Sequence, residues 1–75
     1  MRVIIKQKGQ GLPLKVARVA QGMSQAELAD ASKCSRAAVS GAENGRPIQI
    51  KTAYKLAAAL NRDFSTLFDT ETIDG

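Results

Sequence analysis

Residues 24–45 read SQAELADASKCSRAAVSGAENG, and this stretch carries two helix-start signals eleven residues apart. The first is a capping box, in which Ser24 and Glu27 can each bond the backbone N–H of the other. The second is Ser35, a residue type that is strongly preferred at a helix N-cap. Asn44-Gly45 then favours a left-handed stop at the end of the second helix. The stretch therefore predicts two short helices joined by a tight turn.

Two helices this short and this close cannot lie antiparallel, so they are expected to cross steeply, as in a helix-turn-helix unit. Small or branched apolar side chains suit such a crossing, and they are present at Ala26, Ala29 and Val39. The outward positions of the second helix carry only small or hydrogen-bonding side chains, namely Arg36, Ala37, Ser40 and Gly41. A helix without bulky apolar groups on its outer face can enter the major groove of duplex DNA.

The segments on either side of this pair predict further short elements. Arg2–Lys6 is rich in β-branched residues and predicts a strand. A helix is expected from Pro13 to Gly22, a fourth from Ile50 to Leu60, and a fifth after the cap residue Asp63. The apolar positions expected to face the core are Leu14, Val16, Ala17, Ala20, Leu28, Ile50, Ala53, Tyr54, Ala57, Leu60, Phe64, Leu67 and Phe68.

The sequence contains no internal repeat, linker or second domain. We therefore expect one compact all-α domain of five helices with a short N-terminal strand. An N-terminal strand or arm is assigned to residues 1–10, the helical domain to residues 11–69, and a frayed acidic tail to residues 70–75.

The composition excludes several classes of function. One cysteine and no histidine among 75 residues exclude an internal disulfide, a Cys/His zinc site and a His-activated nucleophile. No apolar run approaches the ~20 residues needed to cross a bilayer, and no secretory segment opens the chain. We therefore expect a cytoplasmic protein that is not an enzyme and has no catalytic site, metal, cofactor, small-molecule ligand or membrane contact.

The charge is unevenly distributed along the chain. Residues 1–62 hold all eleven basic residues and three acidic ones, a formal charge of +8, whereas the whole chain carries +4. A basic body of this size favours a polyanion such as nucleic acid, although +4 could also serve solubility alone. Because only two Phe and one Tyr are available to stack on unpaired bases, a duplex is favoured over single strands.

Together these motifs resemble the Xre/Cro-type helix-turn-helix family of phage and bacterial repressors. The resemblance rests on Arg18, residues 24–29, residues 35–40 and Glu43-Asn44-Gly45, and it continues through residues 56–60 and 63–68. It implies a lambda-repressor-like fold over about residues 13–68. It also implies a Cro-like, operator-binding repressor of double-stranded DNA in a bacterial or phage-infected cell.

The family implies a role for each matching position. The recognition helix, about residues 35–43, is expected in the major groove, with Arg36 on a guanine and Ala37 on a thymine methyl. Arg18 and Glu43 match a pair that bridges the first and third helices and turns the arginine toward the DNA. The expected DNA-contacting residues are Gln25, Ser35, Arg36, Ala37, Ser40, Gly41, Asn44, Arg46 and Lys51.

Each of these roles has a simpler alternative. Gln25 and Arg36 could be ordinary solvated side chains, and Ser35 could be a helix cap alone. Arg18 and Glu43 could form an exposed ion pair worth at most ~1 kcal/mol.

Several residues depart from the family pattern. Lys33 stands where the family usually has glycine, and a left-handed conformation there would cost ~1–2 kcal/mol. Ser32 and Ala42 stand where larger apolar residues are usual, so a thin core is expected. Gly41 removes one base-reading side chain, and Cys34 is expected to be a packed thiol rather than a redox switch.

A single module of this kind is small for tight specific binding, so a homodimer on a palindromic operator is expected. Arg2–Lys6 could pair with the same strand of a second copy, act as a disordered basic arm through Lys6 and Lys8, or dock on its own domain. The alternative function is an antitoxin or another interaction module that also binds its promoter, with the strand or the acidic tail holding a partner.

Overall fold

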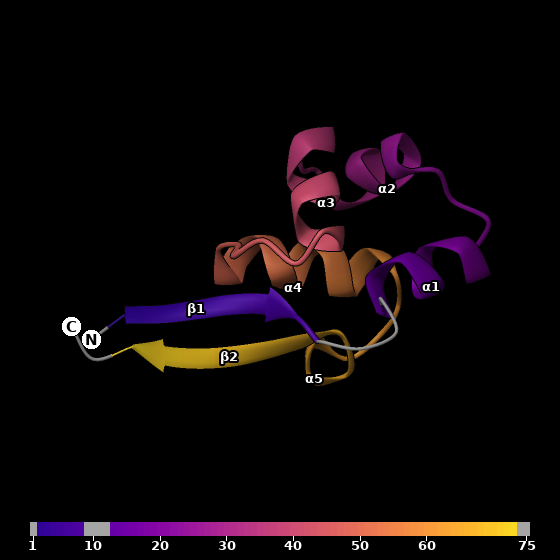
Figure 1. Cartoon of the computed structure of the whole chain (residues 1–75). Coiled ribbons are helices and arrows are strands. Elements are labelled where there is room, and N and C mark those ends of the chain that lie inside the picture. The colour runs from indigo at the N-terminus through magenta and orange to yellow at the C-terminus, as the bar shows by residue number, and fades with distance from the viewer. Residues whose placement is uncertain (1, 9–12, 74–75) are drawn as a thin grey trace.

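The computed structural model describes residues 2–8 and 13–73 (Figure 1). Within these residues the chain forms five short helices, which are α1 (Pro13–Ala20), α2 (Gln25–Ser32), α3 (Arg36–Glu43), α4 (Ile50–Ala59) and α5 (Phe64–Leu67). Two strands, β1 (Arg2–Gln7) and β2 (Phe68–Ile73), form a small sheet. Each helix begins and ends within two residues of its predicted bounds, so the helical prediction is confirmed.

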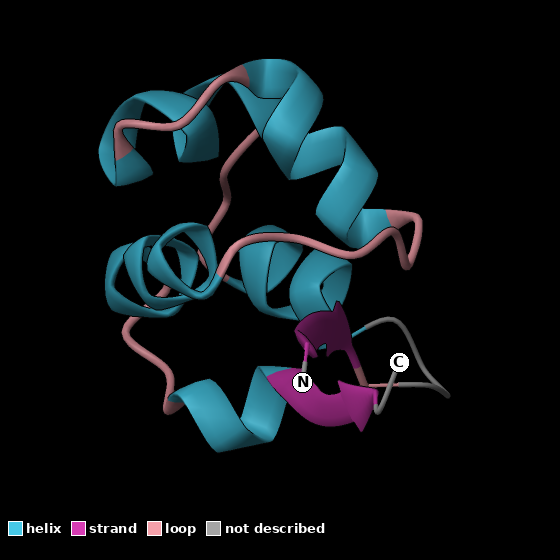
Figure 2. Ribbon diagram, turned by 90° about the vertical axis from the view of Figure 1, so that its left-hand side faces the viewer, coloured by secondary structure: helices cyan, strands magenta, loops and turns pink. Residues whose placement is uncertain are grey.

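The α2–α3 pair and the sheet lie on two sides of α4, and α5 lies on the side of the sheet (Figures 1 and 2). In both views α2 and α3 stand on one side of this helix, and the two strands lie on the other (Figures 1 and 2). The core draws side chains from every one of these elements, and its largest fully buried members are Ile5, Leu14, Leu28, Val39, Leu56 and Leu60. The helix-turn-helix pair therefore rests on α4, and α3 also contacts β1 of the sheet directly.

The sheet joins the two ends of the described chain. β1 pairs antiparallel with β2, and Arg2 lies opposite Ile73 in the register. On its other edge β1 meets the α3–α4 loop, where the backbone N–H of Ile48 donates to the carbonyl of Ile5 at 2.9 Å. β1 therefore docks on its own domain, which is the third of the arrangements expected for it.

β2 corrects two predictions. The segment expected to be a frayed acidic tail from residue 70 is a strand as far as Ile73, and a second strand does exist in the sequence. In the register Thr70 lies opposite Ile5 and Thr72 opposite Val3, so β-branched residues pair across the sheet. The described residues are thus mostly helical and fit the expected all-α helix-turn-helix fold, to which the two-stranded sheet is an addition. Residues 74–75 of the expected tail and residues 1, 9 and 10 of the expected arm lie outside the described residues.

Some positions expected in the core are exposed instead. Val16, Ala20, Ala26 and Ile50 all face solvent in this chain. In a helix of about two turns only one narrow stripe faces the neighbouring elements, so a residue adjacent to that stripe stays outside the core. Tyr54 is also 56% exposed, and its ring stacks on Phe64 with 4.6 Å between the centroids.

Two of the three predicted N-caps, Ser24 and Ser35, make side-chain cap bonds, whereas Asp63 precedes α5 without one. The hydroxyl of Ser24 accepts from the backbone N–H of Glu27 at 3.1 Å, and the Glu27 carboxylate accepts from the Ser24 N–H at 2.9 Å. Hydrogen bonding to the carboxylate, from the Ser24 backbone N–H first and the Ser24 side chain second, holds the pKa of the Glu27 carboxyl below its ordinary value. The stabilisation is present above that ordinary value and is lost as the pH falls through the lowered pKa. Ser35 caps α3 in the same way, through the N–H of Ala38 at 3.0 Å.

The turn between α2 and α3 contains a left-handed residue that is not glycine. Lys33 has φ 57° and ψ 39°, and its backbone N–H bonds back to the last turn of α2. This is the conformation that was expected to be costly for a residue with a Cβ. At the end of α3 the same kind of stop falls on Gly45, with φ 81°, where no Cβ is present.

Replacing Lys33 by glycine is expected to raise the free energy of unfolding by about 1 kcal/mol, because the left-handed conformation then strains no Cβ. Lys33→Ala is the matched control, since it removes the same charge and keeps the Cβ. Urea unfolding followed by circular dichroism measures both variants. Equal stability of the glycine and alanine variants would contradict this account of the turn.

Candidate nucleic-acid interface

One face of α3 is anchored in the core and the other is open. Val39, Ala42 and Glu43 are buried, while Arg36 and Ala37 in the first turn are exposed. The capping residue Ser35 is also exposed, and Ser40 and Gly41 are half-buried. The predicted outer face therefore carries no large apolar side chain, and it is accessible in the isolated chain.

Arg46 lies beside Gly41 on α3, at a distance that a methyl group at position 41 would also allow. The backbone N–H of Arg46 donates to the carbonyl of Gly41 at 2.9 Å. A methyl group at Gly41 would lie 3.7 Å from Cδ of Arg46, an ordinary van der Waals distance. The arginine stem thus passes along the helix at the one position without a side chain.

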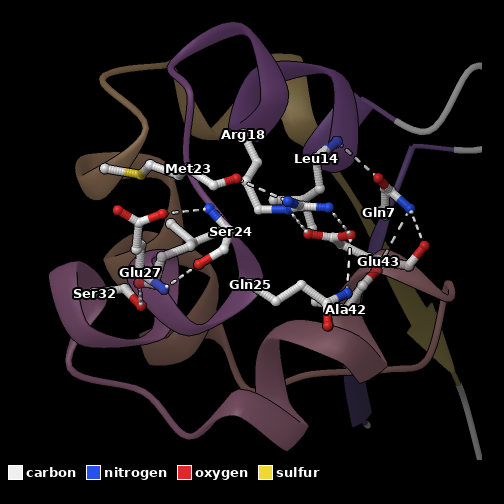
Figure 3. A network of polar contacts seen from close by, with 11 residues as sticks. Gln7, Leu14, Arg18, Met23, Ser24, Gln25, Glu27, Ser32, Ala42 and Glu43 are labelled. Carbon is white, nitrogen blue, oxygen red and sulfur yellow. Dashed lines mark hydrogen bonds and ion pairs between the residues drawn. The ribbon is translucent and has the colours of Figure 1, made fainter.

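The C-terminal end of α3 is fixed by an ion pair with α1. Nε of Arg18 lies 2.6 Å from Oε2 of Glu43, and its terminal nitrogen lies 3.2 Å from Oε1 (Figure 3). The other terminal nitrogen of Arg18 donates to the carbonyl of Met23 at 2.8 Å. The two side chains are only 11% and 6% exposed. The pair therefore bridges α1 and α3 as the family implies, and the alternative of an exposed ion pair is wrong.

Gln25, at the start of α2, joins this network. Its side-chain amide donates to Oε1 of Glu43 at 3.3 Å (Figure 3). The Glu43 carboxylate, at the end of α3, thereby accepts bonds from both α1 and α2. Gln25 is half-buried, so part of its side chain remains accessible at the surface.

Gln7 is the functional residue that sequence reasoning missed. It is 7% exposed, and its amide donates to the carbonyl of Glu43 at 3.0 Å while its Oε1 accepts from the N–H of Leu14 at 2.7 Å (Figure 3). A single side chain from β1 thus satisfies the end of α3 and the start of α1. The available signal was the period of two in the strand, which puts Gln7 on the same face as the buried Ile5.

Five of the nine expected DNA-contacting residues border one of two hollows in the surface. The first has a volume of about 590 Å³ and is bordered by Gln25 and Asn44 together with Arg18 and Glu43. The second has a volume of about 310 Å³ and is bordered by Ala37, Gly41 and Arg46. The remaining four, Ser35, Arg36, Ser40 and Lys51, border neither hollow. Lys51 is exposed in the first turn of α4.

The described residues hold no group of three or more His, Cys, Asp or Glu side chains that could bind a metal ion. No helix in this part of the chain is long and apolar enough to cross a membrane. Cys34 is half-buried, and its thiol lies 3.5 Å from the carbonyl of Ser32.

Breaking the Arg18–Glu43 pair is expected to cost far more stability than breaking the exposed pair between Lys8 and Asp69. Glu43→Ala leaves the Arg18 guanidinium unpaired in a nearly buried position, a loss of about 3–5 kcal/mol. Lys8→Ala breaks a pair whose side chains are 46% and 59% exposed, and a loss below about 1 kcal/mol is expected.

Thermal and urea unfolding of the two variants make this comparison, with Glu43→Gln as a variant that preserves the shape of the side chain. Its loss should fall between the other two, because the amide still accepts one bond. Similar small losses for Glu43→Ala and Lys8→Ala would show that the network does not hold α3.

A comparison with protein families places these features in context. A family model described as helix-turn-helix, HTH_3, matches residues 14–67. The match spans α1 to α5 and leaves β1 and β2 outside. No curated protein matches the chain. Because the matched residues make up more than half of the sequence and contain the whole α2–α3 pair, the chain belongs to the Xre/Cro-like helix-turn-helix family of DNA-binding domains.

Proposed function

We propose that this chain is an operator-binding transcriptional repressor that reads double-stranded DNA with α3 in the major groove. The observation that carries the proposal is the open face of α3. Arg36 and Ala37 are exposed there, whereas Val39 and Ala42 are buried on the opposite face. A helix anchored along one side and free of large apolar groups on the other has the form that the groove accepts.

Arg36 is the main candidate for direct base readout. Its exposed guanidinium, in the first turn of α3, can offer two donors to O6 and N7 of a guanine. Ala37 suits a thymine methyl, and Ser40 suits a base or a phosphate. Gly41 offers no side chain, so Arg36 and the shape of the DNA carry most of the sequence preference.

Phosphate contacts on both sides of the groove hold α3 in register. The residues to which we assign this role are Gln25, Ser35, Asn44, Arg46 and Lys51. Gln25 has the additional help of the N-terminus of α2, where unpaired N–H groups attract an anion. Arg18 acts at one remove, because its bonds to Glu43 and Met23 fix the neighbours of Gln25.

We further propose that the repressor binds a palindromic operator as a homodimer. One module covers on the order of 600–1,000 Å² of DNA contact, and two modules on half-sites about one helical turn apart double it. The strand contact proposed at Arg2–Lys6 has to use the edge of β1 that β2 leaves open. Among the described residues only the Ile48 bridge occupies that edge.

The alternative function of an antitoxin or interaction module gains no support from these observations. It needs the strand or the acidic tail to hold a partner, and β1 and β2 already pair with each other over Arg2–Gln7 and Phe68–Ile73. No contact among the described residues favours a different protein over a second copy of this chain at the remaining edge of β1. We therefore retain the repressor as the single proposal.

Selection from random duplex sequences with the purified protein tests the proposed function. A palindromic consensus is expected, and a reporter under a promoter that carries this consensus should fall in expression when the protein is present. Recovery of no consensus, or a reporter unaffected by the protein, would refute the repressor proposal.

Exchanging Arg36 for alanine is expected to weaken binding to the selected operator by about 1–3 kcal/mol, or roughly 5- to 150-fold, and to relax base preference at one position of each half-site. Arg62→Ala is the matched control, since Arg62 is also exposed but follows the end of α4, away from α3. Titrations on the operator and on single-base variants give both values. Base preference unchanged at every position in Arg36→Ala would contradict the assigned readout.

A further inference from the structure

β1 contributes to a basic hollow beside the helix-turn-helix. The hollow of about 590 Å³ is lined by Lys6, at the end of β1, by Lys8 just after it, and by Lys15 of α1. It is also lined by Gln25, at the start of α2, and by Asn44, just after α3. Residues from opposite parts of the chain thus form one continuous wall.

The charge of this hollow is strongly positive. Four basic side chains line it, Arg18 and the three lysines, against the single carboxylate of Glu43. Glu43 is already paired with Arg18 at 2.6 Å. Among the described residues, neither Lys6 nor Lys15 has a carboxylate within ion-pair distance. Their charges are therefore available to an anion.

The ion pair that Lys8 makes within the chain is weak. Its Nζ lies 3.6 Å from the carboxylate of Asp69, and both side chains are about half exposed. An exposed pair of this length contributes little and is screened by salt, so a phosphate can compete for the lysine.

Gln7 fixes the position of its two neighbours, Lys6 and Lys8, relative to α3. It lies between Lys6 and Lys8 in the sequence, and its buried amide bonds the carbonyl of Glu43 and the N–H of Leu14. The lysines therefore belong to a segment that is tied directly to the C-terminal end of α3. This arrangement differs from a basic arm whose charges have no fixed position.

We propose that Lys6, Lys8 and Lys15 bind backbone phosphates of the operator that lie beyond the contacts of the helix-turn-helix, so that β1 is part of the DNA interface. The inference rests on the proposed function, in which Gln25 and Asn44, two other residues of the same hollow, hold phosphates. A DNA strand that contacts these two residues therefore lies at the hollow that the lysines also line. Lys6 and Lys8 lie outside the residues that match the family, so this contact is an addition made by the present chain.

The test compares two triple variants of equal charge. Lys6→Ala/Lys8→Ala/Lys15→Ala removes the hollow's lysines, and Lys33→Ala/Lys55→Ala/Arg62→Ala removes three exposed basic residues that do not line it. Affinity for the selected operator is measured over a range of salt concentrations. For the hollow variant the slope of log K against log[salt] should fall by roughly 2–3, about 0.9 for each phosphate that the variant no longer neutralises. The control variant should keep the wild-type slope.

DNA length provides a second and independent measurement. Trimming the base pairs that flank the operator should weaken the wild-type protein and the control variant, but should leave the hollow variant unchanged. The hollow variant should lose affinity without losing preference for the operator over unrelated DNA, because phosphates carry no sequence information, whereas the control variant should stay close to the wild-type affinity. Urea unfolding of both variants verifies that they fold.

The outcomes separate the two proposals. If the wild-type protein selects no duplex sequence, both the repressor function and this inference are overturned. If it binds its operator but the two triple variants share one salt slope and one response to trimming, the repressor stands and the role of the hollow is refuted.

Discussion

The carboxylate of Glu43 is the point on which the geometry of the recognition helix depends. Glu43 is only 7% exposed, and its carboxylate accepts hydrogen bonds from Arg18 of α1 and Gln25 of α2. Its backbone carbonyl accepts a bond from Gln7 of β1. A charge held this far from water is tolerated only when its partners are in place. The network therefore admits one relative position of these elements, and α3 can leave its N-terminal face bare because its other end is fixed.

Polar bonding of this kind compensates for a core that is thin. Ser32 and Ala42 are buried where larger apolar side chains were expected from the family. The Ser32 hydroxyl bonds back to the carbonyl of Leu28 at 2.7 Å, so its burial leaves no donor unpaired. Across the described residues every buried side-chain nitrogen or oxygen has a partner. Small apolar groups and satisfied polar groups together give a domain of this size its specificity of packing.

The sequence predicted the helices well because their boundaries depend on local chemistry. Ser24, Ser35 and Gly45 act within one turn of their own position, and so their effects can be read from neighbouring letters. The Arg18–Glu43 bridge was also predicted, although through a family resemblance rather than through spacing. That the Arg18–Glu43 ion pair is nearly buried rather than exposed, by contrast, needed the three-dimensional structure.

β2 and Gln7 were missed for the opposite reason. The strand depends on a partner at the other end of the sequence, and acidic residues in an apparently terminal segment suggested solvent instead. Thr70 and Thr72 carry the β-branched signal, but an isolated pair of threonines is weak without β1 beside it. No residue near Gln7 in the sequence marks its role, because the two backbone groups that its side chain bonds, in α1 and α3, are brought to it only by the fold.

The pairing of the first strand with the last has a consequence for the order of synthesis. During translation β1 leaves the ribosome first, but its partner is made only after all five helices. The five helices are connected by short loops and can assemble early. The sheet pairs the first strand with the last, so it must close a much longer loop and forms late. A nascent or prematurely ended chain would thus have its helices before it had its sheet, and a translation product that stops short of residue 68 would leave β1 as an unpaired edge open to other chains.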